Sequence, residues 1–220
     1  AWGGMFVHND DVYFVGVNHP LENLVIRKST NNGATWTTAT DTSDGILRQE
    51  SGALGYHTAP VPVVVAEGRI WRAYEDNAAP GIGVWPSKYR SGLMSAPVDA
   101  DLLDSSNWTF TNLIESDVGP DGKVVNVMRV DVEPGRPEYA AITRAQDAST
   151  LTFDHTQDIV PMPGGSKKFS IRYNEDTGTY WALGNIVNED NYDFDERPAT
   201  IRNTLAVLQS TDLTDWVVED

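Results

Sequence analysis

The sequence predicts an all-β fold, a β-propeller in which about four blades are visible. Helical periodicity is nearly absent, and short runs rich in Val, Ile, Tyr, Phe and Trp recur between clusters of Asn, Asp, Gly and Pro. A chain of 220 residues is also long enough to bury a large core. We therefore expect a single propeller domain over residues 1–220, with approximate repeats at 1–50, 51–112, 113–160 and 161–220.

Each expected repeat begins with a β-hairpin. Turn-forming residues stand between two strand-like runs, and this pattern returns roughly every 55 residues, a spacing typical of repeat architectures. The expected hairpins are 7–14, 65–71, 119–125 and 173–181.

A second pair of strands is expected after each hairpin, separated by a polar turn and ending in a strand that an aromatic residue opens. The segments are 24–36, 93–109, 140–154 and 205–216, with Trp36, Trp108, Phe153 and Trp216 as the aromatic residues. Four antiparallel strands in each repeat are the composition of a propeller blade. An unrepeated β-sandwich, whose turns recur by accident, is the alternative architecture.

Two of the polar turns resemble the Asp-box of sialidases and related propellers, Ser-x-Asp-x-Gly-x-x-Trp. Residues 29–36 match it except at Asn31, and residues 210–216 form a shorter version without the glycine. Longer stretches resemble bacterial sialidase-like (BNR-repeat) glycosidase-type proteins, and this resemblance covers most of the chain. The stretches are 56–65, 68–73, 94–103, 164–173 and 201–206.

This resemblance implies carbohydrate chemistry on a propeller scaffold. Such proteins usually continue with at least one more blade, so we expect this chain to be a partial propeller or one completed by another chain. An open propeller would leave an unpaired sheet edge.

Propeller active sites lie at one mouth of the central channel, which is formed by inner strands and by the loops between blades. Candidate residues are therefore those at the ends of the hairpin strands. The catalytic candidates are His57, Tyr74, Glu75, Asp76 and Asp131, and the substrate-binding candidates are Arg72, Arg129, Lys168, Arg172 and Arg202.

The residue types support this selection, although each also has a structural interpretation. An imidazole such as that of His57 suits proton transfer, and a hydrogen-bonded histidine at a blade junction is the alternative. Glu75 and Asp76 point to opposite faces of a strand, so we expect one of them to face the channel. Sugar rings could stack on Trp2, Trp85 and Tyr89.

Several arginines at comparable places in the repeats suit bidentate binding of a carboxylate or sulfate. Sialidases use an arginine triad, a Tyr–Glu nucleophile pair and an Asp acid/base, so the resemblance implies this type of site. No motif assigns these roles to particular residues here. The alternative is that these arginines are strand-end residues paired with surplus carboxylates.

The predicted function is a sialidase-like glycoside hydrolase that cleaves a terminal sugar, acidic or neutral, from a glycan. Asp76 or Asp131 would protonate the leaving oxygen, and a group such as Tyr74, Glu75 or His57 would support attack at the anomeric carbon. One alternative is a polysaccharide lyase in which His57 or a tyrosine abstracts the proton next to a uronate carboxylate. A glycan-binding propeller without catalysis is the other.

The composition limits the possible ligands, cofactors and cellular location of the protein. A formal charge of −16 argues against nucleic-acid binding, and the absence of cysteine excludes disulfides and thiolate-bound metals. Apolar runs are too short to span a bilayer, and an acidic surface suits an extracellular or periplasmic protein. We expect no cofactor and no metal site. Residues 188–196 offer hard oxygens for Ca²⁺, but a solvated acidic loop is the favoured interpretation. The oligomeric state stays open.

Overall fold

The structure, a computed structural model, describes residues 2–19, 21–52, 54–58, 61–78, 89–113, 124–188 and 195–219. The chain divides into two compact units, and each is described by itself. Unit 1 comprises Ala1–Asp117, Asp121–Val124 and Ala145–Thr152, and unit 2 comprises Val118–Pro120, Val125–Arg144 and Phe153–Asp220.

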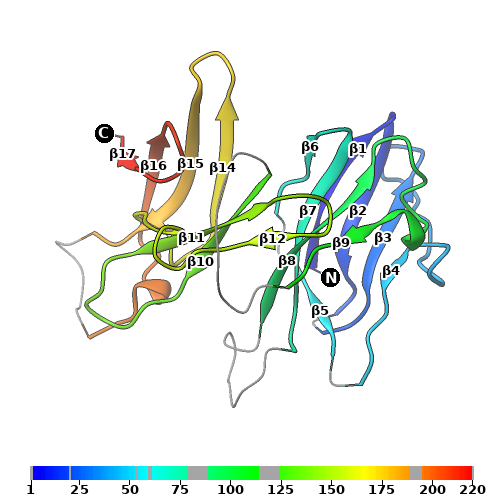
Figure 1. Cartoon of the computed structure of the whole chain (residues 1–220), viewed down its shortest axis with the longest axis horizontal. Coiled ribbons are helices and arrows are strands. Elements are labelled where there is room, and N and C mark those ends of the chain that lie inside the picture. Colours follow the sequence, from blue (N-terminus) through cyan, green and yellow to red (C-terminus); the bar gives the residue numbers. More distant parts are fainter. Residues whose placement is uncertain are drawn as a thin grey trace. The chain divides into compact units, whose positions relative to one another are not determined.

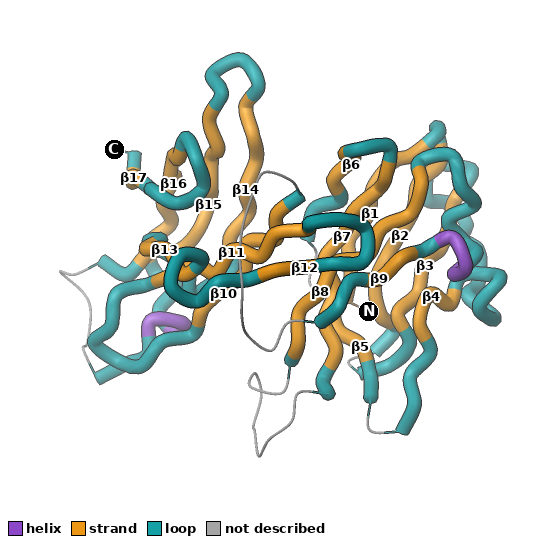
Figure 2. Tube along the Cα trace, viewed as in Figure 1, coloured by secondary structure: helices purple, strands orange, loops and turns teal. Residues whose placement is uncertain are grey.

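The described residues form strands and loops almost throughout, in four successive sheets (Figures 1 and 2). The first sheet has the order β1-β2-β3-β4, from Trp2–His8, Asp11–Val17, Leu24–Ser29 and Ile46–Arg48. In the second, β5-β7-β8-β9 are Tyr56–His57, Arg69–Asp76, Arg90–Pro97 and Thr109–Phe110, and β6 (Val64–Ala66) also pairs with β7.

The third sheet has the order β10-β11-β12, from Val125–Val130, Tyr139–Ala145 and Leu151–Thr152, with β13 (Ile159–Pro161) also beside β11. The fourth has the order β14-β15-β16-β17, from Phe169–Asn174, Thr179–Ile186, Thr204–Ser210 and Val217–Val218. Among the described residues, the short 3₁₀ turns η1 (Ser105–Asn107) and η3 (Pro198–Thr200) interrupt the loops. The predicted all-β class, with four blade-like sheets, is confirmed.

Three of the four expected hairpins are present. Asn9 and Asp10 join β1 to β2 with φ of 49° and 65°, and Glu67 and Gly68 join β6 to β7 with φ of 51° and 69°. Left-handed conformations at both turn residues match the right-handed twist of the flanking strands. The turn between β14 and β15 contains Gly178 at φ 66°.

The expected hairpin at 119–125 falls largely outside the described residues, because 119–123 are not among them. The hairpin that the structure describes in the third sheet is formed instead by β10 and β11, joined through residues 131–138.

The prediction of a strand that begins at Trp36 is wrong. The backbone N–H of Thr37 still donates to the carbonyl of Lys28 near the end of β3 at 2.9 Å, and the hydroxyl of Thr37 accepts from the N–H of Lys28 at 2.9 Å. However, β4 begins only at Ile46. Asp41 accepts bonds from the backbone and hydroxyl of Ser43, which turns the chain before it reaches β4. By contrast, Trp108 and Trp216 directly precede β9 and β17, as expected.

The turn after β3 is held by its own polar side chains. The hydroxyl of Ser29 accepts from the backbone N–H of Gly33 at 2.8 Å, and Oδ1 of Asn31 accepts from that of Thr35 at 2.9 Å. The indole of Trp36 donates to the carbonyl of Gly33 at 3.0 Å. Gly33 adopts φ 87°, which favours glycine at this position.

The turn after β16 repeats this pattern with one residue fewer. Ser210 accepts from the backbone of Leu213 at 2.9 Å, Asp212 accepts from that of Thr214 at 2.8 Å, and the indole of Trp216 donates to Leu213 at 2.9 Å. Leu213 takes the left-handed conformation, at φ 72°, and its side chain is buried in the core of unit 2.

We expect the turn at Asp212 to make the fold sensitive to acid. Backbone hydrogen bonds from Asp215 and Thr214 lower the pKa of Asp212 below its ordinary value of 3.8. A carboxyl whose pKa is lower in the folded state stabilises the fold above pH 3.8, and that contribution disappears as the pH falls through the folded pKa. The Asp212→Asn variant should therefore be less stable than wild type at neutral pH, with a difference that vanishes in acid.

Urea unfolding at a series of pH values measures this difference. The exposed Asp99→Asn variant, which removes one carboxylate outside this turn, is the control for the change in net charge. A gap for Asp212→Asn that stays constant from neutral pH into acid would contradict the assignment.

Each unit has an apolar interior. In unit 1, β2, β3, β7 and β8 pack around a core that includes Val15, Ile26, Ile70, Tyr74 and Met94. In unit 2, residues of β11, β13, β15 and β16 form a second core. No helix of the described residues has the length and apolar character that crossing a membrane requires.

Candidate active site

A histidine and a glutamate face each other at the ends of two paired strands in unit 1. β5 pairs with the end of β7 so that His57 lies opposite Glu75. Nδ1 of His57 is 3.1 Å from Oε2 of Glu75, within hydrogen-bonding distance. The side chains are 21% and 41% exposed, so both groups are accessible while part of each is screened from water.

Two aromatic rings flank the imidazole. The ring of Trp2, from β1, has its centroid 5.9 Å from that of His57, and the ring of Tyr89, directly before β8, lies at 5.4 Å. Burial and then the negative charge of Glu75 raise the pKa of Tyr89, which keeps its hydroxyl protonated. The result is an acid–base pair beside two aromatic residues, of which Trp2 is 43% exposed.

The backbone around the start of β5 is closely held. Asn77 bonds Gly55 twice, through its Oδ1 at 2.8 Å and its N–H at 3.3 Å, and Leu21 donates to the carbonyl of Tyr56 at 3.1 Å. A Cβ on Gly55 would lie 2.0 Å from the carbonyl oxygen of Leu21, so only glycine allows this approach. These contacts fix the backbone that carries His57.

Asp76, the neighbour of Glu75, points to the other face of β7 and is bound by Arg90. Oδ1 of Asp76 accepts from Nε of Arg90 at 2.8 Å, and Oδ2 accepts from Nη2 at 2.6 Å. The side chain of Asp76 is 2% exposed. Of the two adjacent carboxylates, Glu75 is the accessible one.

The other unit 1 candidates, Arg72 and Tyr74, are buried on the same face of β7 as Asp76. Nη1 of Arg72 donates to the carbonyl of Val61 at 2.8 Å, and burial lowers its pKa to about 10. Burial raises the pKa of Tyr74 to about 12, and its hydroxyl has no hydrogen-bond partner among the described residues. Both environments favour a structural role over contact with substrate.

The remaining candidates belong to unit 2 and are exposed there: Arg129, Asp131, Lys168, Arg172 and Arg202. Arg172 and Arg202 donate to backbone carbonyls close to them in sequence. Asp131 pairs with Arg197 at 3.2 Å, an exposed ion pair of a kind that contributes little to stability. The predicted meeting of four arginines stays a prediction, because Arg72 belongs to unit 1 and the others to unit 2.

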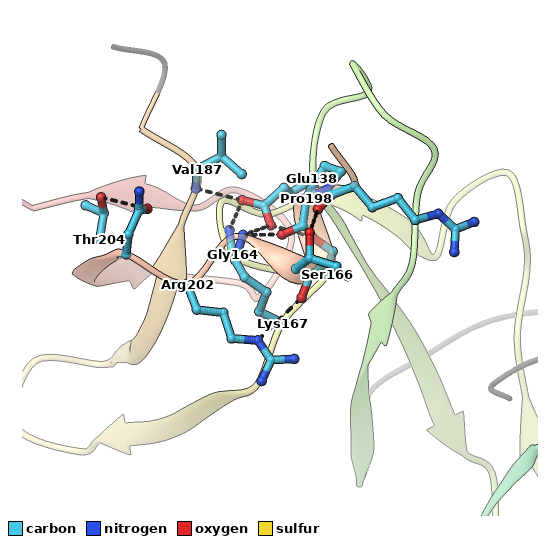
Figure 3. Close-up of polar contacts among 12 residues, drawn as sticks. Glu138, Gly164, Ser166, Lys167, Val187, Pro198, Arg202 and Thr204 are labelled. Atoms are coloured by element: carbon cyan, nitrogen blue, oxygen red, sulfur yellow. Dashed lines mark hydrogen bonds and ion pairs between the residues drawn. The ribbon is translucent and has the colours of Figure 1, made fainter. Parts of the chain in front are cut away.

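Unit 2 also contains a buried ion pair that the sequence did not suggest (Figure 3). Nζ of Lys167 is 2.5 Å from Oε1 of Glu138, which also accepts from the hydroxyl of Ser166. Oε2 accepts from the backbone N–H groups of Gly164 at 2.8 Å and Val187 at 3.2 Å. The side chains of Lys167 and Glu138 are 1% and 7% exposed.

This cluster connects four segments of unit 2 and does not face solvent. Lys167 donates a second bond, of 3.2 Å, to the carbonyl of Pro198 in η3. Burial lowers the pKa of Lys167, Glu138 raises it, and the positive charge of Arg202 lowers it again. The buried cluster is therefore a structural element.

Of the sequence candidates, the structure brings His57 and Glu75 into contact and separates Glu75 from Asp76. Sequence reasoning missed Arg90. The only signal for it was its position at the start of a strand, since its partner Asp76 is 14 residues away. Trp85 lies outside the described residues, as do residues 189–194 of the acidic run at 188–196. Among the described residues, no group of three or more His, Asp or Glu side chains could hold a metal ion.

Comparison with known proteins finds no matching family model and no matching curated protein. Solved structures with a similar arrangement include a GH43 β-1,3-galactosidase with galactodeoxynojirimycin, at a TM-score of 0.49, 13% identity and coverage of 99% of this chain and 74% of that one. An α-L-arabinofuranosidase from Lactobacillus brevis matches with a TM-score of 0.45 and 14% identity, over 99% of this chain and 71% of that one. A mutant α-L-arabinanase from Cellvibrio cellulosa matches with a TM-score of 0.42 and 11% identity, over 97% of this chain and 71% of that one. These neighbours are glycoside hydrolases, and the sialidase type stays a prediction.

Proposed function

We propose that the protein is a carbohydrate-active enzyme, a glycoside hydrolase whose site in unit 1 is built on His57 and Glu75. The observation that carries the proposal is the 3.1 Å contact between these two groups within a border of aromatic rings. Sugars present apolar C–H faces that stack on aromatic rings, and glycosidic cleavage uses a carboxylic acid that protonates the leaving oxygen.

In this mechanism, Glu75 exchanges the proton. Protonated Glu75 donates to the glycosidic oxygen as the C–O bond breaks, and the resulting carboxylate is stabilised by the Nδ1–H of His57 at Oε2. The proton returns from the water that enters at the anomeric carbon. The rings of Trp2 and Tyr89 hold the sugar against this pair, which restricts its orientation.

The sialidase form of this proposal requires a cation for an acidic sugar. In unit 1, Arg90 is engaged by Asp76, and Arg72 is buried. Arg48 lies with its guanidinium 4.2 Å from the ring centroid of Phe110, in a cation–π contact. Among the described residues of unit 1, the contacts of these three arginines favour a neutral terminal sugar at this site over an acidic one.

A polysaccharide lyase is the second candidate, and the neighbouring rings of His57 and Tyr89 favour it. In this reaction, His57 would take the proton next to a uronate carboxylate, and the protonated Tyr89 would give one to the leaving oxygen. The two reactions differ in product, because elimination leaves a carbon–carbon double bond and hydrolysis does not.

The full chain, incubated with neutral glycans, sialosides and uronic-acid glycans, should release a terminal sugar. Chromatography of the products measures release, and ultraviolet absorbance detects the unsaturated product of a lyase. We expect a terminal sugar to be released without an increase in ultraviolet absorbance. We also expect its release to be faster from neutral glycans than from acidic ones.

The control for nonspecific effects is His155→Ala, which removes an exposed histidine of unit 2 and should leave turnover unchanged. Glycan binding without any product would contradict the proposal and support a binding propeller. Turnover only with an ultraviolet-absorbing product would replace it with the lyase.

A further inference from the structure

We infer that Asp76 and Arg90 are positioning residues, which hold Glu75 and Tyr89 beside His57. The inference deepens the proposed function and rests on it. It also changes the role that the sequence suggested for Asp76, from proton donor to support for its neighbour.

The strand register places this ion pair directly behind the site. Asp76 lies opposite Arg90 where β7 pairs with β8, and it lies opposite Tyr56 where β7 pairs with β5. Each partner is the chain neighbour of a site residue, since Asp76 follows Glu75 and Arg90 follows Tyr89. A shift of the pair along the strands therefore moves both site residues.

The geometry of the pair is restrictive. The guanidinium forms two parallel bonds to the carboxylate, at 2.8 and 2.6 Å, and Oδ1 also accepts from the backbone N–H of Ala78 at 3.2 Å. A charge-assisted bidentate contact fixes orientation as well as distance. At 2% exposure, the carboxylate of Asp76 is also screened from competing water.

The same contacts explain why Asp76 is not the proton donor. Both of its oxygens are occupied by the guanidinium, and its side chain lies on the opposite face of β7 from Glu75. A group that donates to a glycosidic oxygen must reach that oxygen. Asp76 acts instead through Glu75, while Arg90 acts through Tyr89.

The test uses the full chain with Asp76→Asn and with Arg90→Lys, which retains the charge and loses the planar fork. We expect kcat to fall roughly tenfold to a hundredfold in both variants, with KM changed much less, because small displacements of a reacting group have such effects. The matched control is Asp158→Asn, which breaks another buried Asp–Arg pair, that with Arg144 in unit 2.

A second measurement does not depend on turnover. The ¹⁵N chemical shifts of the imidazole report which ring nitrogen of His57 carries the proton, and its bond to Glu75 favours protonation at Nδ1. We expect the shifts to change in Asp76→Asn and Arg90→Lys, and to match wild type in Asp158→Asn. Thermal unfolding identifies any variant that does not fold. If Asp76→Asn does not fold, the kinetics and imidazole shifts of Arg90→Lys test the positioning role.

The two proposals fail in different ways. If wild type turns over no glycan, the glycosidase proposal fails, and the imidazole shifts alone decide the positioning role. Wild-type shifts and kinetics in a folded Arg90→Lys variant would overturn that role. An equal loss of kcat in Asp158→Asn would overturn it as well, since general destabilisation would then explain the effect.

Discussion

The Glu138→Ala variant is expected to lose about 3–5 kcal/mol of unfolding free energy, the cost of leaving one member of a buried ion pair without its partner. Lys167, whose side chain is 1% exposed in the intact pair, would keep among the described residues only the positive charge of Arg202 as its charged neighbour. The backbone N–H groups of Gly164 and Val187 would also lose their acceptor. Few single substitutions reach this size, because most surface changes are nearly neutral.

Urea unfolding of the full chain measures the loss. Glu175→Ala, at an exposed position in the turn between β14 and β15, is the control and should unfold like wild type. Adding Lys167→Met to Glu138→Ala should recover part of the loss, because the unpaired charge is then gone. No recovery in the double variant would show that the backbone contacts, and not the ion pair, carry the effect.

The pH dependence of this variant has a definite sign. Burial already places the pKa of Lys167 below 10.5, and removing Glu138 removes the contact that raises it. The unfolded chain then binds the lysine proton more tightly than the folded one, so folding becomes more favourable as the pH rises toward 10.5. The deficit of Glu138→Ala should therefore shrink in alkaline solution.

The Glu75→Gln variant is expected to lower kcat by roughly 10²- to 10⁴-fold, the usual contribution of a positioned acid or base. Glutamine has the shape of glutamate, and its carbonyl can still accept from Nδ1 of His57, so the local structure should persist. What disappears is the exchangeable proton. His57→Ala should also reduce turnover, since it removes the hydrogen-bond partner of Oε2.

Initial rates on whichever glycan wild type cleaves measure this effect, with Glu175→Gln as the matched control. Glu175 is an exposed glutamate of unit 2, and its replacement should leave kcat unchanged. Wild-type turnover in Glu75→Gln would remove Glu75 from the mechanism even if the protein proves to be a glycosidase.

The sequence predicted the hairpins well where short-range chemistry determines the turn. Asn9–Asp10 and Glu67–Gly68 lie between alternating apolar runs, and no distant contact is needed to form such turns. The strand at Trp36 was mispredicted for a related reason. A second local turn at Asp41 competes with strand formation, and the aromatic signal alone does not show which of them prevails.

The site was less accessible to sequence reasoning. His57 and Glu75 were candidates because they stand at strand ends, but their contact depends on the register between β5 and β7, across 18 residues. Glu138 and Lys167 are 29 residues apart, and charged side chains are usually exposed. Neither residue type nor spacing indicates that such a pair is buried.

Leu213, which has the left-handed conformation, has two structural roles in the short turn after β16. The carbonyl of Leu213 accepts from the indole of Trp216, and the side chain of Leu213 packs in the core of unit 2. One residue therefore stabilises both the turn itself and its contact with the core. At the corresponding place after β3, Gly33 contributes only the backbone half of that connection. A change at Leu213 would therefore disturb the apolar packing of unit 2 as well as the turn, whereas Gly33 has no side chain that packs in the interior.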